Sequence, residues 1–269
     1  MKVGAIQEVL RKLGTRPSKR WGQHFLLHED AAEAIVAFAE LQPGEVVLEV
    51  GPGLGMLTGP LLKRTKNVVA VERDGRLAEY LREQHPDAEL VVGDVLRVSL
   101  PHFDKVVSNL PFEISSPFLE RLLETPFQRA VLTLQREFAE RLVAGPGTKA
   151  YSRLSAKVYY GAVAELGWTI PPSAFWPPPE VDAAVVRLDA RPPPFPVEHD
   201  KYVRVVDALF QHRRKTARNA LRLAVADLGL EEGEIEGRLE GDPLAGKRAD
   251  EMRPEEMAGL TRSLFPSKP

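Results

Sequence analysis

The chain has no cysteine among its 269 residues, which excludes disulfide bridges, thiolate metal sites and a cysteine nucleophile. No apolar run approaches the roughly 20 residues that a membrane helix needs, and the N-terminus lacks the apolar core of a signal peptide. We therefore expect a cytoplasmic protein that has no membrane partner. Among the six histidines, His24 and His28 are four residues apart but lack a third ligand, so we expect no bound metal.

Asparagine is also scarce, since it occurs only at positions 67, 109 and 219, whereas proline occurs 23 times. Such economy in a thermolabile residue is typical of proteins under thermal selection, and it draws attention to Asn109. A hydrophobic content of 43% and a charged content of 28% are ordinary for a globular protein. The length allows one good core plus a smaller appendage, hence one or two domains.

The net charge of −2 conceals blocks of one sign. Residues 1–28 hold six basic side chains and one acid, and residues 211–222 hold five basic side chains and no acid. Residues 227–256 reverse this balance with eleven acids and four bases. Such blocks favour a face that binds a polyanion. Solvated helix faces would explain either basic block alone about as well.

The most informative stretch is residues 46–58, which read VVLEVGPGLGMLT. A branched apolar run that ends in an acid and a glycine-rich turn is typical of a buried parallel strand followed by a loop that passes close to a ligand. Gly51, Gly53 and Gly55 have the spacing E-x-G-x-G-x-G, and Met56 stands where a dinucleotide fingerprint needs glycine. The spacing favours S-adenosylmethionine as the adenosine-containing ligand, although a plain strand-to-turn corner is the alternative.

Three further apolar runs end in polar residues. Residues 68–71 lead to Glu72, residues 90–92 lead to Gly93 and Asp94, and residues 106–107 lead to Ser108 and Asn109. Because the carboxyl ends of parallel strands meet at one edge of a sheet, four such ends in register predict a ligand site. Glu72, 21 residues beyond Gly51, is where an acid would accept hydrogen bonds from ribose hydroxyls.

The order of the remaining patterns predicts an α/β fold with a mostly parallel, Rossmann-like sheet of seven strands. The proline-rich segment 191–196 is a stiff linker and the best boundary between a domain over 1–190 and a small all-α domain over 191–269. Beyond the four strands above, we expect strands over 130–134, 163–170 and 183–188. We expect helices over 3–13, 30–40, 56–64, 75–84, 116–123, 136–143, 151–160, 201–210, 216–228, 232–239 and 254–264.

Residues 109–112, Asn-Leu-Pro-Phe, carry the sharpest chemical signal. An exocyclic amine on an aromatic base is a poor nucleophile because its lone pair is delocalised into the ring. The Asn109 side-chain carbonyl and the Leu110 backbone carbonyl could accept both N–H hydrogens and expose the lone pair to an electrophilic methyl group. Pro111 fixes the turn, and Phe112 offers a face for stacking, worth roughly 1–3 kcal/mol. Such a transfer needs alignment rather than a tuned acid or base, whereas an ordinary Asn-x-Pro turn is the alternative.

These motifs, in this order, resemble those of the KsgA/RsmA-type 16S ribosomal RNA adenine N6-dimethyltransferases, the rRNA adenine dimethylase family. Two positions depart from the family pattern: His24 stands where many members have asparagine, and Phe112 where many have tyrosine. The matching segments run from about residue 19 to residue 222, and they are 22–26, 49–55, 72, 93–94, 109–112, 135–137, 172–182 and 213–219.

The resemblance implies a methyltransferase domain that uses S-adenosylmethionine, followed by a helical domain that binds RNA or the ribosome. It implies dimethylation of two adjacent adenines near the 3′ end of 16S rRNA in the immature 30S subunit, by a protein that we expect to be a monomer. Glu72 would hold the cofactor ribose and Asp94 the adenine amino group. By matched position, the residues expected to line the cofactor site are Gln23, His24, Leu26, Gly51, Gly53, Gly55, Glu72, Arg73, Asp94, Val95 and Asn109.

The resemblance also implies that Phe112 and Phe175 sandwich the target base, although a phenylalanine among prolines is more typical of a packing residue. The spacing of Arg214, Arg218 and Arg222 predicts a stripe one helical turn apart that suits RNA phosphates, and a solvated surface explains it equally well. The RNA contacts expected from the two basic blocks are Lys19, Arg20, Arg213, Arg214, Lys215, Arg218 and Arg222.

Three other functions compete with this interpretation. An Erm-like enzyme would act on 23S rRNA, but the motif at residues 213–219 speaks against it. A ribosome assembly factor would work mainly by binding, with methylation secondary, and both roles can coexist. A DNA-binding role, as in mitochondrial relatives, is less favoured.

Overall fold

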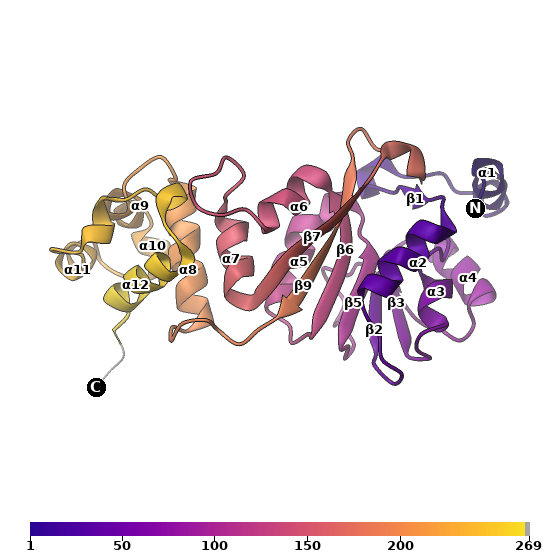
Figure 1. Cartoon of the computed structure of the whole chain (residues 1–269), viewed down its shortest axis with the longest axis horizontal. Coiled ribbons are helices and arrows are strands. Elements are labelled where there is room, and N and C mark those ends of the chain that lie inside the picture. Colours follow the sequence, from indigo (N-terminus) through magenta and orange to yellow (C-terminus); the bar gives the residue numbers. More distant parts are fainter. Residues whose placement is uncertain (267–269) are drawn as a thin grey trace. The chain divides into compact units, whose positions relative to one another are not determined.

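The computed structural model describes residues 1–266, apart from the side chain of Lys19 (Figure 1). The chain forms two compact units: Met1–Ala139 with Ala164–Ala190, and Glu140–Val163 with the chain from Arg191 onward. The division after Ala190 lies just before the proline-rich segment 191–196. Residues 140–163, however, group with the helical unit, because Tyr151 and Tyr160 pack into its core.

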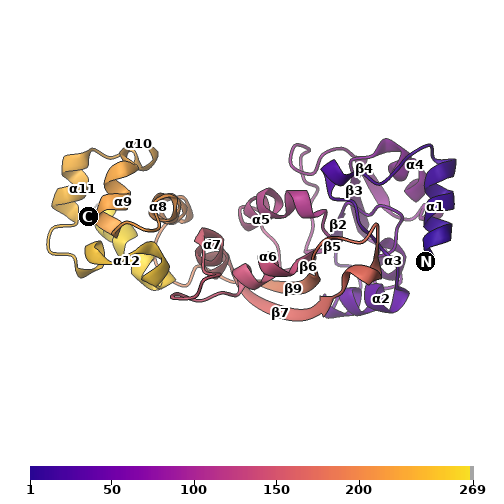
Figure 2. The same ribbon diagram turned by 90° about the horizontal axis from the view of Figure 1, so that it is seen from above.

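The first unit is built on a seven-stranded sheet with the order β4-β3-β2-β5-β6-β9-β7 (Figures 1 and 2). Strands β2 to β6 pair in parallel, and β9 runs antiparallel to β6. This arrangement confirms the predicted α/β fold with a mostly parallel sheet. The strands are β2 (Val47–Val50), β3 (Val68–Glu72), β4 (Glu89–Val92), β5 (Lys105–Asn109), β6 (Arg129–Gln135), β7 (Ala162–Ile170) and β9 (Ala183–Ala190).

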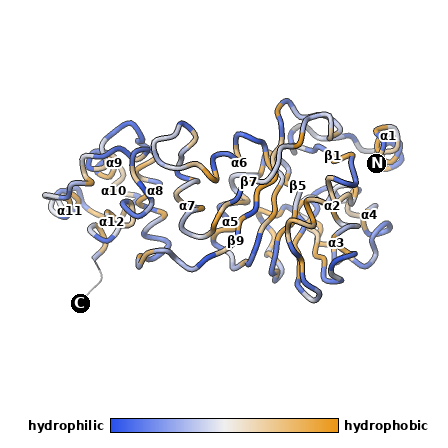
Figure 3. Tube along the Cα trace, in the orientation of Figure 1, coloured by the Kyte–Doolittle hydropathy of each residue, from blue (hydrophilic) through white to orange (hydrophobic). Residues whose placement is uncertain are grey.

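The central strands are buried on both faces, which explains their continuous apolar sequences, and Figure 3 shows the hydrophobic colour concentrated there. On one face, Ile35 and Val36 of α2 and Leu61 of α3 pack against Val107 and Val131 of the sheet. Burial of each such side chain stabilises the fold by about 1.5–3 kcal/mol. The helices of this unit are α1 (Val3–Lys12), α2 (Glu29–Phe38), α3 (Thr58–Leu62), α4 (Gly75–Gln84) and α5 (Ser115–Leu123), and α6 (Arg136–Leu142) follows β6.

A second, two-stranded sheet pairs β1 (Phe25–Leu26) with β8 (Phe175–Trp176) in antiparallel fashion. Phe25 lies opposite Trp176, and Leu26 lies opposite Phe175. Strands of two residues are too short to show an alternating pattern, so the sequence did not predict them. The pairing brings the motif at residues 22–26 beside the proline-rich loop at residues 172–182.

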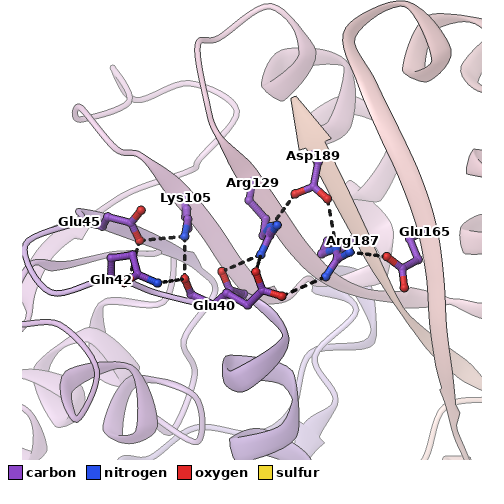
Figure 4. A network of polar contacts seen from close by, with 9 residues as sticks. Glu40, Gln42, Glu45, Lys105, Arg129, Glu165, Arg187 and Asp189 are labelled. Atoms are coloured by element: carbon purple, nitrogen blue, oxygen red, sulfur yellow. Dashed lines mark hydrogen bonds and ion pairs between the residues drawn. The ribbon is translucent and has the colours of Figure 1, made fainter. Parts of the chain in front are cut away.

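An ion-pair network ties the end of α2 to the sheet (Figure 4). Glu40 lies just after the end of α2 and has a φ of 50°. Its carboxylate pairs with Arg129 at 2.6 Å and with Arg187 at 3.5 Å. Its backbone carbonyl accepts a hydrogen bond of 2.9 Å from Lys105, and Asp189 bridges the two arginines. The contacts hold α2 against β5, β6 and β9 at the edge of the sheet opposite the strand ends that carry the polar motifs.

The second unit is helical, as predicted. Its core contains Tyr160 and Tyr202, whose rings stack at 4.9 Å between centroids. The predicted helix over 216–228 is interrupted at Ala224, where ψ is 22°. The helices are α7 (Arg153–Gly161), α8 (His199–Gln211), α9 (Ala217–Leu223), α10 (Val225–Leu228), α11 (Glu232–Arg238) and α12 (Pro254–Leu264). Within residues 1–266, no helix is both long and apolar enough to cross a bilayer.

Candidate active site

A pocket lies at the carboxyl ends of β2, β3, β4 and β5, within the first unit. It gathers nearly all of the residues that the sequence predicts for the cofactor and the target base. Gly55 and Phe175 are the two that do not line it. The predicted residues along its wall are Gln23, His24, Leu26, Gly51, Gly53, Glu72, Arg73, Asp94, Val95, Asn109, Leu110, Pro111 and Phe112.

The glycine-rich loop leaves no room for side chains. Gly51 has a φ of 63°, and a Cβ atom there would lie 2.9 Å from the Pro111 ring. At Gly53, with a φ of 58°, a Cβ atom would lie 3.0 Å from the Phe25 ring. Gly55 turns the loop over His85 rather than facing the pocket, since a Cβ atom there would approach the imidazole to 2.6 Å. Gly51 thus allows the backbone and Pro111 to approach each other beside the pocket.

This packing yields a prediction for Gly51→Ala. The left-handed backbone costs a non-glycine residue about 1–2 kcal/mol, and the new methyl group must displace Pro111. We expect S-adenosylmethionine to bind at least about tenfold more weakly, as measured by calorimetry. Gly75→Ala is the matched control, because a Cβ atom at Gly75 meets nothing within 4 Å. Unchanged affinity in the Gly51 variant would contradict the assigned role of the loop.

Glu72 is fixed by the backbone of two segments. Its carboxylate accepts hydrogen bonds from the N–H of Asp74 at 2.9 Å and from the N–H of Gly53 at 3.1 Å. Burial raises the pKa of Glu72, while the hydrogen bonds from Asp74 and Gly53 oppose this shift. The carboxylate keeps further lone pairs that can accept hydrogen bonds from hydroxyl groups in the pocket.

Glu49 is a site residue that the sequence analysis noted only as the acid at the end of β2. It lines the pocket, is 2% exposed, and accepts a 2.6 Å hydrogen bond from the Thr58 hydroxyl. Burial raises the pKa of Glu49 to about 8, the Thr58 hydroxyl lowers it, and the nearby Glu72 raises it further. Two acids therefore share one buried wall, which is a setting that favours a cationic ligand.

The loop after β4 holds Asp94. Its Oδ1 accepts a 3.0 Å hydrogen bond from the N–H of Leu96, and its Oδ2 lies 3.5 Å from Arg73. The Arg73 guanidinium in turn lies 5.1 Å from the centre of the Trp21 ring. These contacts position a carboxylate near the end of β4, beyond Glu72 of the neighbouring strand β3.

Asn109 is oriented by a contact with the motif at residues 22–26. Its side-chain Nδ2 donates a 3.0 Å hydrogen bond to the backbone carbonyl of His24. Because one end of the amide is held in this way, Oδ1 points elsewhere, and it has no hydrogen-bond partner within residues 1–266. Leu110 is buried and bonds through its N–H to Thr133, while the Phe112 and His24 rings lie 5.4 Å apart at 34°. An acceptor and an aromatic face thus lie together at the pocket wall.

Phe175 lies inside the core rather than at the pocket. It is 2% exposed and packs with residues of α2 and the sheet. The ring therefore presents no free face to a base in this arrangement. A stacking role for Phe175 would require its ring to leave the core. Its present position is that of a packing residue, the alternative given above for a phenylalanine among prolines.

The basic run at residues 213–222 is divided between a turn and a helix. Arg214 precedes α9, so it does not form a one-turn stripe with Arg218 and Arg222, as the spacing predicted. Arg218 pairs with Glu236 at 2.6 Å, and Arg222 pairs with Glu236 at 3.1 Å and also with Glu232. The acidic segment that follows therefore neutralises much of the expected stripe.

The other predicted RNA contacts differ in whether their side chains form ion pairs within the protein. Arg213 pairs with Asp250 at 3.4 Å, whereas Arg214 and Lys215 are exposed and form no ion pair with the described residues. Arg20 is exposed at the rim of the pocket, and the side chain of Lys19 lies outside the described groups. Over residues 1–266, no cluster of three or more histidine, aspartate or glutamate side chains could hold a metal ion.

The fold and the site together define a class of protein. The sheet order, the side-chain-free glycine loop after β2 and the acids at the ends of β2 and β3 are those of a Rossmann-like methyltransferase that uses S-adenosylmethionine. The residues present fit this cofactor, because Gly51 and Gly53 bring backbone to the pocket wall and the buried acids Glu49 and Glu72 beside them suit a cationic group.

Comparison with known proteins identifies the family. The pattern of the ribosomal RNA adenine dimethylase family matches residues 14–252. A probable ribosomal RNA small subunit methyltransferase A of Thermococcus gammatolerans is 44% identical over 254 residues, covering 94% of this chain and 91% of that protein. The protein of the same name from Methanosarcina mazei is 41% identical over 268 residues, covering 98% of each. This chain belongs to the ribosomal RNA adenine dimethylase family.

Solved structures agree with this assignment. The dimethyladenosine transferase from Plasmodium falciparum has a TM-score of 0.79 at 26% identity, covering 88% of this chain and 96% of that one. The 23S rRNA methyltransferase ErmE has a TM-score of 0.67 at 29% identity, covering 89% of this chain and 99% of that one. The protein is an rRNA adenine dimethyltransferase, which confirms the predicted fold class and enzyme class.

Proposed function

We propose that this enzyme dimethylates N6 of two adjacent adenines near the 3′ end of 16S rRNA, using the immature 30S subunit in the cytoplasm as its substrate. The names of the relatives, which refer to the small subunit, support the choice of subunit. The observation that carries the chemistry is the orientation of Asn109, whose amide is held by the His24 carbonyl beside the glycine-loop pocket.

In this proposal the protein acts by gripping and aligning the target amine. Asn109 Oδ1 and the Leu110 carbonyl accept the two N–H hydrogens of adenine N6, and the purine stacks on Phe112. Accepting both hydrogens draws the nitrogen toward tetrahedral geometry, which makes its lone pair available for attack. Pro111, packed against Gly51, fixes the turn that presents both oxygens. The proton can leave after attack, so no group of the site needs a pKa near neutrality.

The cofactor contacts follow from the same geometry. S-adenosylmethionine, when bound, supplies an electrophilic methyl group on a sulfonium. Glu72 would accept hydrogen bonds from the ribose hydroxyls, and Asp94 would accept one from the adenine amino group. The glycine loop would lie against the ligand without side chains. Gln23, His24, Leu26, Arg73 and Val95 would complete the pocket wall.

Dimethylation places one further demand on the site. After the first transfer the amine has one N–H left, so only one of the two oxygens can accept a hydrogen bond during the second transfer. The new methyl group must then fit beside the other oxygen. We therefore expect the pocket wall at Asn109 to tolerate a methyl group.

Incubation with labelled S-adenosylmethionine and undermethylated ribosomal subunits tests the proposal. We expect label in small subunits only, and nucleotide mapping should place two methyl groups on each of two adjacent adenines near the 3′ end of 16S rRNA. Label in 23S rRNA of large subunits would instead support the Erm-like alternative. The structural likeness to ErmE is the observation that favours this alternative. Absence of label from both subunits would contradict the proposal.

The assembly-factor alternative needs a different comparison. If binding matters more than methylation, a strain carrying the inactive Asn109→Ala enzyme should mature its small subunits as the wild type does, whereas a deletion strain should not. If methylation matters, both strains should show the same defect. Both strains can be compared by the fraction of free small subunits on sucrose gradients.

The free cations of the helical unit should contribute to RNA binding. We expect Arg214→Glu with Lys215→Glu to weaken small-subunit binding and to reduce the slope of log K against log salt by about 1 for each lost phosphate contact. These two residues suit the test because they form no ion pair with described residues, unlike Arg218 and Arg222. Lys66→Glu, an exposed residue of the first unit, is the control. An unchanged salt slope would remove Arg214 and Lys215 from the interface.

A further inference from the structure

His24 makes three contacts that join separate parts of the site. Its ring Nδ1 lies 2.7 Å from the backbone carbonyl of Pro177, in the proline-rich loop. Its ring lies 5.4 Å from that of Phe112, and its own carbonyl accepts the hydrogen bond from Asn109. One half-buried residue thus touches the loop at residues 175–179, the aromatic face and the amide acceptor.

The chemistry of the contact with Pro177 fixes the direction of the hydrogen bond. A backbone carbonyl can only accept, so His24 Nδ1 must carry the hydrogen and donate it. This donation sets the plane of the imidazole, which lies tilted against Phe112. The ring nitrogen engaged with Pro177 is therefore committed to the protein and is unavailable to a cofactor.

We propose that His24 is a positioning residue for methyl transfer, which holds β8 and the loop that follows it at Pro177 against the Asn109–Phe112 segment through the hydrogen bond from its Nδ1 to Pro177. This inference rests on the proposed function of that segment. It gives the Nδ1 atom of His24 an alignment role, in addition to the place of this residue in the pocket wall. The backbone carbonyl of His24 also aligns the site, because it accepts the hydrogen bond that orients the Asn109 amide.

Asparagine could make the same contact with Pro177 as histidine does. In histidine the Nδ1 atom is bonded to Cγ, and in asparagine the Nδ2 atom is also bonded to Cγ. Either side chain can therefore place a donor at the same distance from the backbone, facing the Pro177 carbonyl. The hydrogen bond survives an exchange between the two residues, whereas the ring beside Phe112 does not.

This equivalence separates the donor from the ring in an experiment on the full-length enzyme with small subunits. His24→Phe keeps a ring but removes the donor, and His24→Asn keeps the donor but removes the ring. We expect His24→Phe to lower kcat by about 10- to 100-fold, as misalignment of a reacting group does. We expect His24→Asn to keep most of the wild-type kcat, because it retains the donor. The dissociation constant of S-adenosylmethionine, measured by calorimetry, should change by a smaller factor than kcat does in His24→Phe.

Several outcomes would overturn the proposal. A His24→Phe enzyme with wild-type kcat would show that the donor is not needed, and a His24→Asn enzyme as slow as His24→Phe would show that the ring matters instead. Weakened cofactor binding with unchanged kcat would show that His24 acts through the cofactor and has no alignment role. Thermal unfolding of both variants checks that they fold, and a circular dichroism midpoint close to wild type is expected. If the wild-type enzyme itself fails to methylate small subunits, the proposed function fails rather than this inference.

Discussion

Asn109→Ala should reduce methyl transfer by about 10²- to 10³-fold, because it removes one of two acceptors that act on the reacting amine in a preorganised site. The Leu110 carbonyl remains, but a single acceptor cannot hold both N–H hydrogens of adenine N6. The alanine also leaves the His24 carbonyl without its hydrogen-bond donor. Single-turnover transfer from labelled S-adenosylmethionine to undermethylated small subunits measures the effect.

The same variant should keep most of its affinity for S-adenosylmethionine, because the cofactor contacts proposed above come chiefly from Glu72, Asp94 and the glycine loop. Asn67→Ala is the matched control, since Asn67 is an exposed asparagine that donates to the Gly44 carbonyl at 2.9 Å, away from the pocket. Loss of cofactor binding without an effect on single-turnover transfer at saturation would contradict the role given to Asn109.

Glu49→Gln should stabilise the protein without its cofactor. In the unfolded chain Glu49 ionises near its ordinary pKa of 4.5, whereas burial raises its folded pKa to about 8. Folding at pH 7 therefore requires uptake of a proton, at a cost of about 3 kcal/mol. Glutamine is uncharged and can still accept the hydrogen bond from Thr58, so the variant avoids this cost. Urea denaturation at pH 7 should show a higher free energy of unfolding.

The difference in stability between the wild type and Glu49→Gln should depend on pH. Below about pH 4 the two proteins should have equal stability, because the acid is protonated in both the folded and the unfolded state. The wild type then loses stability relative to Glu49→Gln as the pH rises from about 4.5 to 8, and the difference levels off above that range. A difference that is independent of pH would mean that Glu49 has the same pKa in the folded and the unfolded protein. Glu89→Gln, at an exposed position, is the control.

A cost of this size needs a compensating function. At pH values where Glu49 is ionised, near 8 and above, we expect the Glu49→Gln enzyme to bind S-adenosylmethionine about tenfold more weakly, since it lacks the negative charge beside a cationic ligand. In the wild type the affinity should rise with pH as Glu49 ionises, and this rise should be absent from the variant. Calorimetry at pH 6 and pH 8 compares the two proteins.

The large sheet and most of the pocket could be predicted because their signals are local. Each of β2, β3 and β5 is a short run of buried branched residues, and the residue type changes abruptly where the strand ends. Parallel pairing then brings Glu49, Glu72 and Asn109 to one edge, whatever the details of the helices between them. The chemical interpretation of residues 109–112 needed no long-range contact.

Features that depend on long-range packing could not be predicted in the same way. The pairing of β1 with β8 joins residues about 150 positions apart through two residues each, so neither segment shows a strand pattern. The burial of Phe175 follows from that pairing, because its partner Leu26 is also part of the core. The placement of residues 140–163 in the helical unit depends on aromatic packing of Tyr151 and Tyr160, which a linear pattern does not reveal.

The charge pattern of the sequence showed where basic and acidic residues cluster, but it did not show which of them form ion pairs. The basic block at 211–222 and the acidic block that follows it were both evident, yet only the fold brings Arg218 and Arg222 against Glu232 and Glu236. The signal that could have found these pairs is the equal spacing of the two sets, because Arg218 and Arg222 on α9 and Glu232 and Glu236 on α11 are each four residues apart. The raised pKa of Glu49 was likewise hidden, because it depends on burial and on the neighbouring strand.

The central claim is that Asn109 and Leu110 hold an adenine amino group beside the methyl donor. A crystal structure with adenosine and a stable analogue of S-adenosylmethionine tests it most directly. We predict that the adenosine N6 lies about 3 Å from both Asn109 Oδ1 and the Leu110 carbonyl oxygen, with its purine against Phe112. An amino group bound elsewhere, with residues 109–112 turned away from the cofactor, would contradict the account.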